Sequence, residues 1–437
     1  MQKLLNNFFA IFALGLTMNI HLKEQNLKIS SPSFQSRPLK IALFSGNYNY
    51  VMDGPVRALN KLVMYLEKRG MNVLVFSPTT RNTNIKHAGT LISVPSLALP
   101  GRNEYRIGLG IHGSVQKKLK EFEADLFHIA VPDYLGYCAL RLAKRWGIPA
   151  VSSFHTRFET YLKYYNADWA KKYITSYMRY FYNSCEHVYA PCDSMAQELV
   201  DNSMGNDVRI WSRGVNRSVF NPSTRSNDWR NSLGICDNDV VIGFVGRLVL
   251  EKGLDVLVKT IKVIENISSK YKVLIVGEGP ERFNLEKRLP NAIFTGFLKG
   301  NDLARAYASS DIFFNPSQTE TFGNVTLEAM ASGLPCVCAN ATGSRSLIVD
   351  GENGYLIDPD NIVLYAKALT KIIDNPQKRK LMGRKSYENS LYYDWDTIFN
   401  NMIENYRQAI LNHAEFKLSN YSIQSNEHIP TVANLVK

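Results

Sequence analysis

Two glutamates, Glu320 and Glu328, stand eight positions apart in a segment whose residue types suit a phosphorylated ligand. An apolar run at 311–314 predicts a buried strand before them, and the pattern at 325–330 predicts a helix after them. Asn324 is the candidate N-cap of that helix. Glu320 is then expected on the loop at the carboxyl end of the strand, and Glu328 about one turn inside the helix. Open α/β sheets bind ligands at such edges, and helix N-termini favour anions. This segment therefore predicts a binding site for a phosphorylated ligand whose hydroxyl groups are recognised by the protein.

The complete string ETFGNVTLEAMASGLP, from Glu320 to Pro335, is more specific than a pair of glutamates. It resembles the two-glutamate segment of family 4 of the retaining, nucleotide-sugar-dependent glycosyltransferases. Other parts of the chain match this family in the same order, and the resemblance extends over roughly 39–411.

A pair of cations provides the second element of the predicted chemistry. Sugar transfer from a nucleotide diphosphate requires stabilisation of negative charge on the departing diphosphate. Arg247 ends a predicted strand and Lys252 opens the next helix. The bidentate guanidinium of Arg247, the mobile charge of Lys252 and the positive end of the helix dipole can then act on the same diphosphate. Preorganised charge of this kind contributes about 3–4 kcal/mol for one oxyanion donor. The string FVGRL, followed by KGLDVL, resembles the diphosphate-binding segment of the family.

Metal-binding Asp-x-Asp strings are the alternative to fixed cations, and the chain contains three of them. Their positions favour structural roles, since one precedes a strand, one flanks a proline and one opens a helix. They are Asp237–Asp239, Asp358–Asp360 and Asp394–Asp396. We therefore expect no metal and no cofactor.

The first half of the chain is expected to contribute acceptor contacts. Asp53 and Gly54 lie in the loop after the first strand, where glycine allows a ligand to approach the backbone. His155 follows the fourth strand and matches the strand-end histidine of the family, where it donates a hydrogen bond to sugar or phosphate. Family members often carry two glycines where Asp53 and Gly54 stand here.

The resemblance assigns further roles, residue by residue. It implies that Glu328 holds the ribose, that Glu320 and the amides after Phe322 hold the sugar hydroxyls, and that His155, Arg247, Lys252 and Glu320 act at the reacting centre. The donor-binding residues are expected to be Gly54, Gly277, Gly296, Phe322, Gly323, Asn324, Val325 and Glu328. The family mechanism is front-face attack, in which the leaving phosphate accepts the proton, without a protein nucleophile.

Strand and helix patterns alternate in two series, which predicts parallel doubly wound sheets. Together with the length of 437 residues, this indicates two domains. The resemblance implies the GT-B class of α/β fold, with two Rossmann-like domains facing a cleft. We expect an extension at 1–38, an acceptor-side domain at 39–212, a nucleotide-sugar domain at 213–390, a helix crossing back at 391–411 and a tail at 412–437.

Composition describes an ordinary globular protein, with 45% hydrophobic and 21% charged residues. The net charge of +12 suits an anionic ligand, a nucleic acid or an anionic membrane, without choosing among them. The apolar run at 8–18 is too short to span a bilayer. Three interpretations of the extension remain open: an export signal, a start placed too far upstream and a weak membrane anchor.

The segment 161–182 combines nine aromatic residues with four basic ones. On a helical wheel, one side carries Trp169, Tyr173, Tyr177, Tyr180 and Phe181, and the other side carries mainly Lys171, Lys172 and Arg179. A helix at the interface of an anionic bilayer has this pattern, but so has a helix whose aromatic face packs on its own domain. Nucleic acid is the third alternative, and no recognition module accompanies the segment.

The resemblance implies a retaining, metal-independent hexosyltransferase. The segments SRGVNRSVFNP at 212–222 and SFHT at 153–156 look most like GDP-mannose-dependent alpha-mannosyltransferases and lipid glycosyltransferases within the family. The expected donor is therefore GDP-mannose, and the expected acceptor is a lipid or glycolipid at the cytosolic face of the membrane, with the enzyme peripheral on the inner face of the plasma membrane. A UDP-sugar-dependent enzyme that makes glycolipid or polysaccharide with glucose, glucuronic acid or sulfoquinovose is the first alternative. A nucleotide-sugar epimerase or a non-catalytic binding protein of the same fold is the second.

Overall fold

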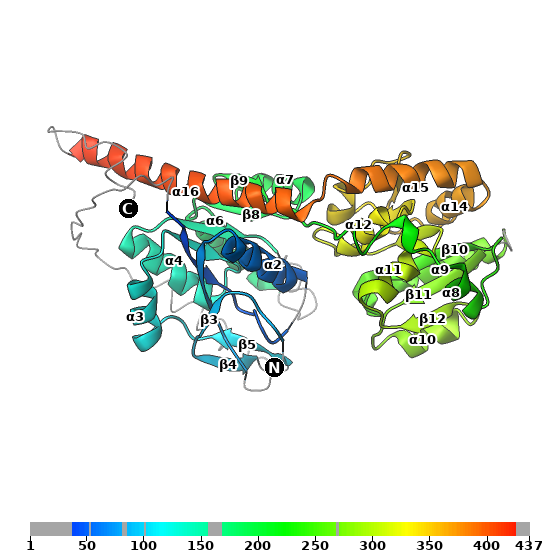
Figure 1. The fold of residues 1–437 in the computed structure, drawn as a ribbon, viewed down its shortest axis with the longest axis horizontal. Coiled ribbons are helices and arrows are strands. Elements are labelled where there is room, and N and C mark those ends of the chain that lie inside the picture. Colours follow the sequence, from blue (N-terminus) through cyan, green and yellow to red (C-terminus); the bar gives the residue numbers. More distant parts are fainter. Residues whose placement is uncertain are drawn as a thin grey trace. The chain divides into compact units, whose positions relative to one another are not determined.

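The computed structural model describes residues 37–51, 54–80, 85–99, 102–155, 168–267 and 271–424. These residues form two compact units (Figure 1). Unit 1 contains the described residues up to Ala190, together with Leu199–Arg209 and those from Phe399 onward, and unit 2 contains Pro191–Glu198 and Ile210–Ile398. The short segment Pro191–Glu198 groups with unit 2, whereas the sequence assigned all of 39–212 to the first domain.

Unit 1 is built on a seven-stranded sheet with the order β3-β2-β1-β6-β7-β8-β9. The strand pairs from β3 to β8 are parallel. The strands are β1 (Lys40–Phe44), β2 (Asn72–Ser77), β3 (Thr90–Ser93), β6 (Leu126–Ile129), β7 (Ala150–Ser153), β8 (His187–Ala190) and β9 (Val208–Ile210). An antiparallel hairpin, β4 (Ser96–Leu99) and β5 (Arg102–Gly108), stands apart from the sheet.

In unit 1, helices lie between β1 and β2 and between successive strands from β5 to β9, as the alternating pattern predicts. In α2 the apolar residues Val56, Leu59, Val63 and Leu66 are all buried, which is the spacing of one helical face. The helices are α2 (Gly54–Lys68), α3 (Gly113–Phe122), α4 (Tyr134–Trp146), the short η2 (Asp168–Ala170), α6 (Lys171–Tyr182) and α7 (Asp193–Asp201), whose first turns belong to unit 2.

Unit 2 has a six-stranded parallel sheet with the order β12-β11-β10-β13-β14-β15. Its central strand β10 therefore lies beside β13, and the loops that follow these two strands meet at one edge. The strands are β10 (Val240–Val245), β11 (Tyr271–Val276), β12 (Ile293–Gly296), β13 (Ile312–Asn315), β14 (Cys336–Ala339) and β15 (Gly354–Ile357).

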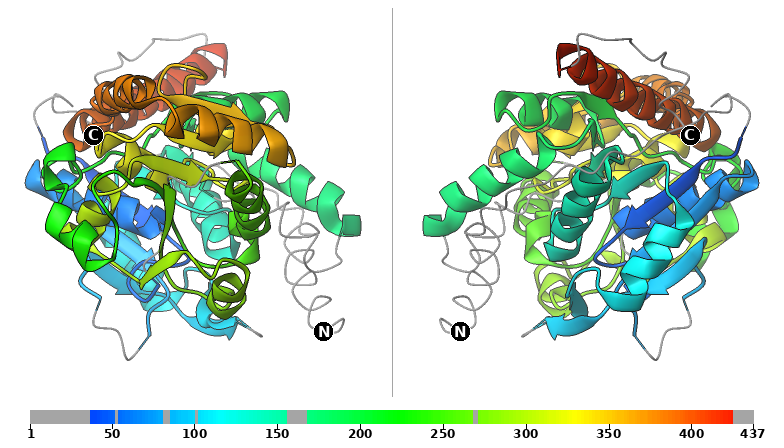
Figure 2. Two further views of the ribbon diagram at one scale, coloured as in Figure 1. Left: turned by 90° about the vertical axis from the view of Figure 1, so that its right-hand side faces the viewer. Right: turned by 90° about the vertical axis from the view of Figure 1, so that its left-hand side faces the viewer.

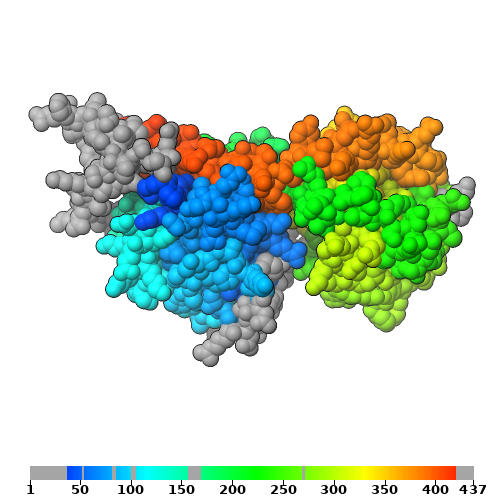
Figure 3. All heavy atoms as spheres, viewed as in Figure 1, coloured from blue at the N-terminus to red at the C-terminus, as the bar shows by residue number. Residues whose placement is uncertain are grey.

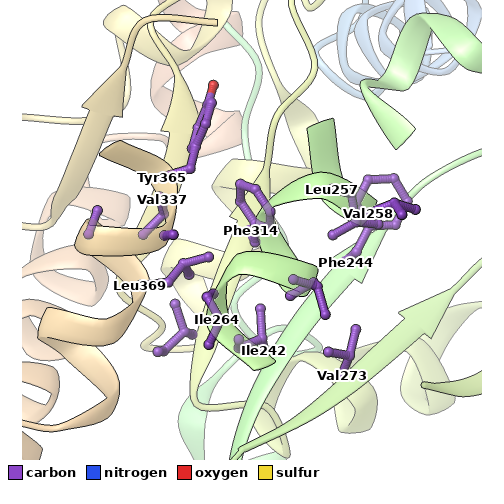
Figure 4. Close-up of a cluster of buried hydrophobic side chains, with 14 of the residues drawn as sticks. Ile242, Phe244, Leu257, Val258, Ile264, Val273, Phe314, Val337, Tyr365 and Leu369 are labelled. Atoms are coloured by element: carbon purple, nitrogen blue, oxygen red, sulfur yellow. The ribbon is translucent and has the colours of Figure 1, made fainter. Parts of the chain in front are cut away.

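The core of unit 2 lies where this sheet meets α9 and α14. Figure 4 shows Phe244, Phe314 and Val337 of the sheet facing Leu257 of α9 and Leu369 of α14. The helices of the unit are η3 (Pro222–Thr224), α8 (Asn227–Ser232), η4 (Leu250–Lys252), α9 (Leu254–Glu265), α10 (Arg282–Arg288), α11 (Gly300–Ala308), α12 (Asn324–Ala331), α13 (Thr342–Arg345), α14 (Ile362–Ile373) and α15 (Pro376–Ser390).

The last helix, α16 (Trp395–Gln424), runs beyond the expected segment 391–411. The sequence predicted that the polar residues from 412 onward form a tail. The structure instead continues the helix to Gln424, and side chains of its carboxyl half bind unit 1. His413 Nδ1 lies 2.6 Å from Glu186 Oε1, and Lys417 Nζ donates to the Gly147 carbonyl at 2.6 Å. Figure 3 shows α16 lying along α2 in this unit, where the rings of Phe399 and Tyr65 are 5.2 Å apart.

A buried histidine also ties α16 to the sheet of unit 1. His128 of β6 is fully buried, with Nδ1 2.6 Å from Tyr406 Oη and Nε2 2.5 Å from Ser153 Oγ. Burial lowers the pKa of His128 to about 3, so the imidazole stays neutral in the folded protein. Among the described helices, none combines the length and apolar character needed to cross a membrane.

Candidate functional site

Glu320 lies on the loop between β13 and α12, at the carboxyl edge of the unit 2 sheet. Asn315, the last residue of β13, stiffens this loop, because its amide donates to Thr326 Oγ1 at 3.1 Å and its Oδ1 accepts from the Ser317 amide at 3.2 Å. The N-cap of α12 is Gly323, with φ of 94°, and no side chain caps the helix. The prediction of Asn324 as N-cap is therefore wrong by one residue, since Asn324 already forms the first helical position.

Lys252 and Glu320 form an ion pair, with Nζ 2.6 Å from Oε1. Their side chains are 23% and 15% exposed, so both charges are largely withdrawn from water. The backbones of the two loops are also in contact, because a Cβ at Gly253 would lie 2.5 Å from the Pro316 carbonyl oxygen. This close approach explains why glycine follows Lys252. The two charges that the sequence placed on separate loops thus lie side by side.

Arg247 is the more exposed member of the predicted cation pair. It follows β10, its side chain is 72% exposed, and its guanidinium lies 3.6 Å from the carboxylate of Glu251, four residues along the chain. The Glu251 carbonyl accepts from Thr319 Oγ1 at 3.2 Å, which joins the Arg247 loop to the Glu320 loop. Lys252 and Arg247 thus lie at the same edge of the sheet, where Lys252 is largely buried against Glu320 and Arg247 is exposed beside Glu251.

Glu328 lies on α12 and is half-buried. The hydroxyl of Tyr307, on α11, donates to Glu328 Oε2 at 3.0 Å. Tyr307 carries no distinguishing signal in the sequence, because a tyrosine near the end of an amphipathic helix is common, and it was not predicted as a site residue.

The loop around Glu320 is supported from behind by segments distant in sequence. The amide of Gly343 donates to the Glu320 carbonyl at 3.0 Å. Phe322 is buried and its ring packs edge-on against Tyr393, with centroids 5.9 Å apart, so Phe322 anchors the loop in the unit. Cys192 Sγ lies 3.3 Å from the Thr321 carbonyl. None of the supporting residues Cys192, Gly343 and Tyr393 was predicted.

The glycines predicted for the nucleoside pocket follow β11 and end β12. Gly277 has φ of 145°, and a Cβ there would lie 1.9 Å from the Gly246 carbonyl oxygen. Its amide donates to the Gly296 carbonyl at 2.9 Å. The close packing of three strand ends accounts for glycine at 277 without a ligand, so the donor-binding roles of Gly277 and Gly296 stay predictions. Asn324 and Val325 lie at the start of α12.

The residues predicted in the first half of the chain belong to unit 1. His155 follows β7 and is 7% exposed. Gly54 is the first residue of α2, at the carboxyl side of β1. Asp53 lies outside the described residues, as does the part of the aromatic segment at 161–167.

The three Asp-x-Asp strings are parts of turns and helix starts. Asp394 Oδ2 accepts from the Thr397 amide at 3.0 Å, which caps α16. Asp239 Oδ2 accepts from the Cys236 amide at 2.8 Å and closes a turn before β10. Asp358 lies in the short loop between β15 and α14.

Comparisons with known proteins identify the family of the chain. Residues 225–389 match the model "Glycosyl transferases group 1", and residues 52–219 match "Glycosyltransferase Family 4". The chain is 30% identical to sulfoquinovosyl transferase SQD2 of Arabidopsis thaliana, covering 85% of this chain and 74% of that protein. It is also 30% identical to a GDP-mannose-dependent alpha-mannosyltransferase of Corynebacterium glutamicum, covering 86% and 90%.

An alpha-monoglucosyldiacylglycerol synthase of Acholeplasma laidlawii is 24% identical, covering 81% of this chain and 94% of that protein. Among solved structures, sucrose-phosphate synthase from Thermosynechococcus elongatus superposes with a TM-score of 0.68 at 19% identity, covering 85% and 98%. The two parallel-sheet units and this similarity confirm the predicted GT-B fold class. The chain belongs to glycosyltransferase family 4 and is a glycosyltransferase that uses nucleotide sugars.

Proposed function

We propose that the protein transfers mannose from GDP-mannose to a lipid or glycolipid acceptor, with retention of configuration and without a metal ion. The observation that carries the transferase assignment is the Lys252–Glu320 pair at the edge of the unit 2 sheet, beside the N-terminus of α12. This pair places the Lys252 ammonium, which can bind a diphosphate, next to the Glu320 carboxylate, which can accept hydrogen bonds from sugar hydroxyls.

Each charged group has a role in this proposal. Lys252 and the exposed Arg247 hold the diphosphate and stabilise the charge that develops on it as the glycosidic bond breaks. Glu320 accepts hydrogen bonds from the sugar, with amides at the start of α12 around it, and Glu328 holds the ribose. His155 donates a hydrogen bond to the sugar or phosphate. The leaving phosphate accepts the proton of the acceptor hydroxyl, so no protein nucleophile takes part.

The choice of donor and acceptor rests on the relatives. The mannosyltransferase match covers nine-tenths of that protein and supports GDP-mannose as the donor. The similarity to an alpha-monoglucosyldiacylglycerol synthase supports a lipid acceptor. We place the reaction at the cytosolic face of the membrane, where nucleotide sugars are available.

Helix α6 and the preceding η2 support a peripheral membrane location. Trp169, Tyr173 and Tyr180 are 61%, 69% and 49% exposed, and they follow the spacing of one helical face. Lys144 Nζ lies 4.8 Å from the centre of the Tyr180 ring. Figure 2 shows α6 at the margin of unit 1. Aromatic rings beside basic residues suit the interface of an anionic bilayer.

The aromatic face differs from the predicted one at Tyr177 and Phe181. Tyr177 is only partly exposed, and its ring centroid lies 6.4 Å from that of Tyr137. Phe181 is buried, together with Met178 and Tyr182, and forms the side of α6 that packs on unit 1. The inward packing of one aromatic side agrees with the interpretation of a helix that packs on its own domain. Membrane binding by the exposed aromatic side stays a proposal.

A panel of labelled GDP- and UDP-sugars, incubated with membrane lipid extract, tests the proposal. We expect a lipid-soluble mannosylated product from wild type and none from Glu320→Ala or Lys252→Ala. Equal product from wild type and both variants would refute the site. Transfer from a UDP-sugar alone would replace the donor, and conversion of the nucleotide sugar without acceptor would show an epimerase. Activity that is lost in a chelator and restored by a divalent ion would refute the metal-free mechanism.

A further inference from the structure

Tyr307 of α11 is buried at 1% exposure, with its hydroxyl on the carboxylate of Glu328. A buried tyrosine hydroxyl requires a hydrogen-bond partner, and many backbone carbonyls could supply one. Here the partner is instead Glu328, a half-buried glutamate in the second turn of α12. The bond links two helices, α11 and α12, and holds Oε2 of Glu328 at 3.0 Å from the phenol oxygen.

Aromatic contacts fix the position of the Tyr307 ring. The ring of Phe220 packs edge-on against it, with centroids 5.8 Å apart at 76°, and the ring of Phe313 packs at 5.8 Å and 55°. Because the ring is enclosed, its hydroxyl cannot turn away from Glu328 without repacking the core. Burial, followed by the charge of Glu328, raises the pKa of Tyr307 well above its ordinary value. The phenol therefore stays protonated at neutral pH and can donate its hydrogen bond.

We propose that Tyr307 is a positioning residue for nucleoside recognition: it fixes the Glu328 carboxylate in the orientation that accepts the ribose hydroxyls of a nucleoside diphosphate. This inference rests on the proposed ribose-binding role of Glu328. A glutamate side chain has three rotatable bonds, and their restriction before the ligand arrives lowers the entropic cost of binding. The hydroxyl of Tyr307 supplies this restriction without touching the ligand.

Titration calorimetry with GDP and UDP, and with their 2′-deoxy and 3′-deoxy counterparts, tests the inference. Tyr307→Phe removes only the hydroxyl and retains the ring packing. We expect it to weaken the binding of the ribonucleotide by about 5- to 10-fold, the effect of part of a hydrogen bond to a charged group. Binding of the deoxynucleotide that lacks the recognised hydroxyl should stay unchanged. With the sugar donor, KM should rise by a similar factor while kcat changes little.

Two further variants make the experiment decisive. Tyr365→Phe is the matched control, because Tyr365 is a buried tyrosine of the same unit whose hydroxyl donates to the Ile357 carbonyl at 3.4 Å, and Figure 4 shows that hydroxyl pointing out of the core cluster. It should keep the full preference for ribonucleotide. Glu328→Gln should lose that preference.

The outcomes separate the inference from the function it rests on. A wild-type preference for ribonucleotide in Tyr307→Phe, combined with loss of preference in Glu328→Gln, would overturn the positioning role alone. Retention of the preference in both variants would overturn the ribose role of Glu328 as well. If Tyr307→Phe and Tyr365→Phe lose the preference for ribonucleotide equally, the Tyr307 hydroxyl acts only through the stability of the unit, and the inference is overturned.

Discussion

Lys252 and Glu320, separated by 68 positions in the chain, form a largely buried ion pair at 2.6 Å across the loops of two neighbouring strands. Each residue neutralises the charge of the other in the structure. Under the proposed function, Lys252 exchanges this carboxylate for the diphosphate, and Glu320 exchanges the ammonium for sugar hydroxyls.

Removal of either charge should abolish most of the activity. We expect Lys252→Ala and Glu320→Gln each to lower kcat/KM by about 10²- to 10³-fold, the effect of losing one preorganised charge partner. Steady-state kinetics with the identified donor measure this. Lys259→Ala is the control, because Lys259 forms a pair of the same length with Asp255 on the exposed surface of unit 2. A control variant as inactive as Lys252→Ala would contradict the assignment.

Acid should destabilise unit 1 through His128. The ordinary histidine pKa of 6.5 applies in the unfolded chain, whereas burial lowers the folded pKa to about 3. Between these values the unfolded state binds one more proton, so the contribution of His128 falls as pH drops, by about 1.4 kcal/mol per pH unit. When the free energy of unfolding is measured by urea denaturation between pH 6.5 and 4.5, it should fall less steeply with pH in His128→Gln than in wild type. The exposed His87, changed to Gln, should leave the slope unaltered, and a slope unaltered in His128→Gln as well would disprove the prediction.

A methyl group at Gly277 should disrupt the edge of the unit 2 sheet. Both Gly277 and Gly234 have positive φ, but a Cβ at 277 meets the Gly246 carbonyl while a Cβ at 234 meets open space. Gly277→Ala should therefore cost about 1–3 kcal/mol more than Gly234→Ala, the range for overpacking. Chemical denaturation of the two variants measures the difference, and equal losses would mean that backbone strain alone sets the cost.

Aromatic side chains of η2 and α6 should control binding to anionic vesicles. We expect Trp169→Ala with Tyr173→Ala to weaken co-sedimentation with vesicles of mixed neutral and anionic phospholipid about 10-fold or more, since each buried aromatic contributes a large apolar area. Phe283→Ala is the control. Phe283 is 68% exposed and lies 4.1 Å from Lys287 Nζ, so it offers the same chemistry on unit 2. Equal effects of the two changes would indicate nonspecific adsorption.

Short-range patterns in the chain sufficed to predict the parallel sheets and the loops that carry Arg247, Lys252 and Glu320. The reason is local, because an apolar run followed by glycine or a polar turn defines a strand and its end. The strands β3, β4, β5 and β15 were not predicted, and β3, β4 and β15 lack a fully buried apolar run. The start of α12 was misplaced by one residue because Gly323 caps it through its backbone.

Only the tertiary structure brings Tyr307 to Glu328, Lys252 to Glu320 and His128 to Tyr406. Each contact depends on which strands adjoin in the sheet and which helices cover them, and no local pattern encodes that order. Residue types and spacing along the chain therefore fixed the chemistry available at Glu320 and Glu328. The packing of distant segments decided which partner orients each carboxylate, because a side chain's position is set by the contacts around it.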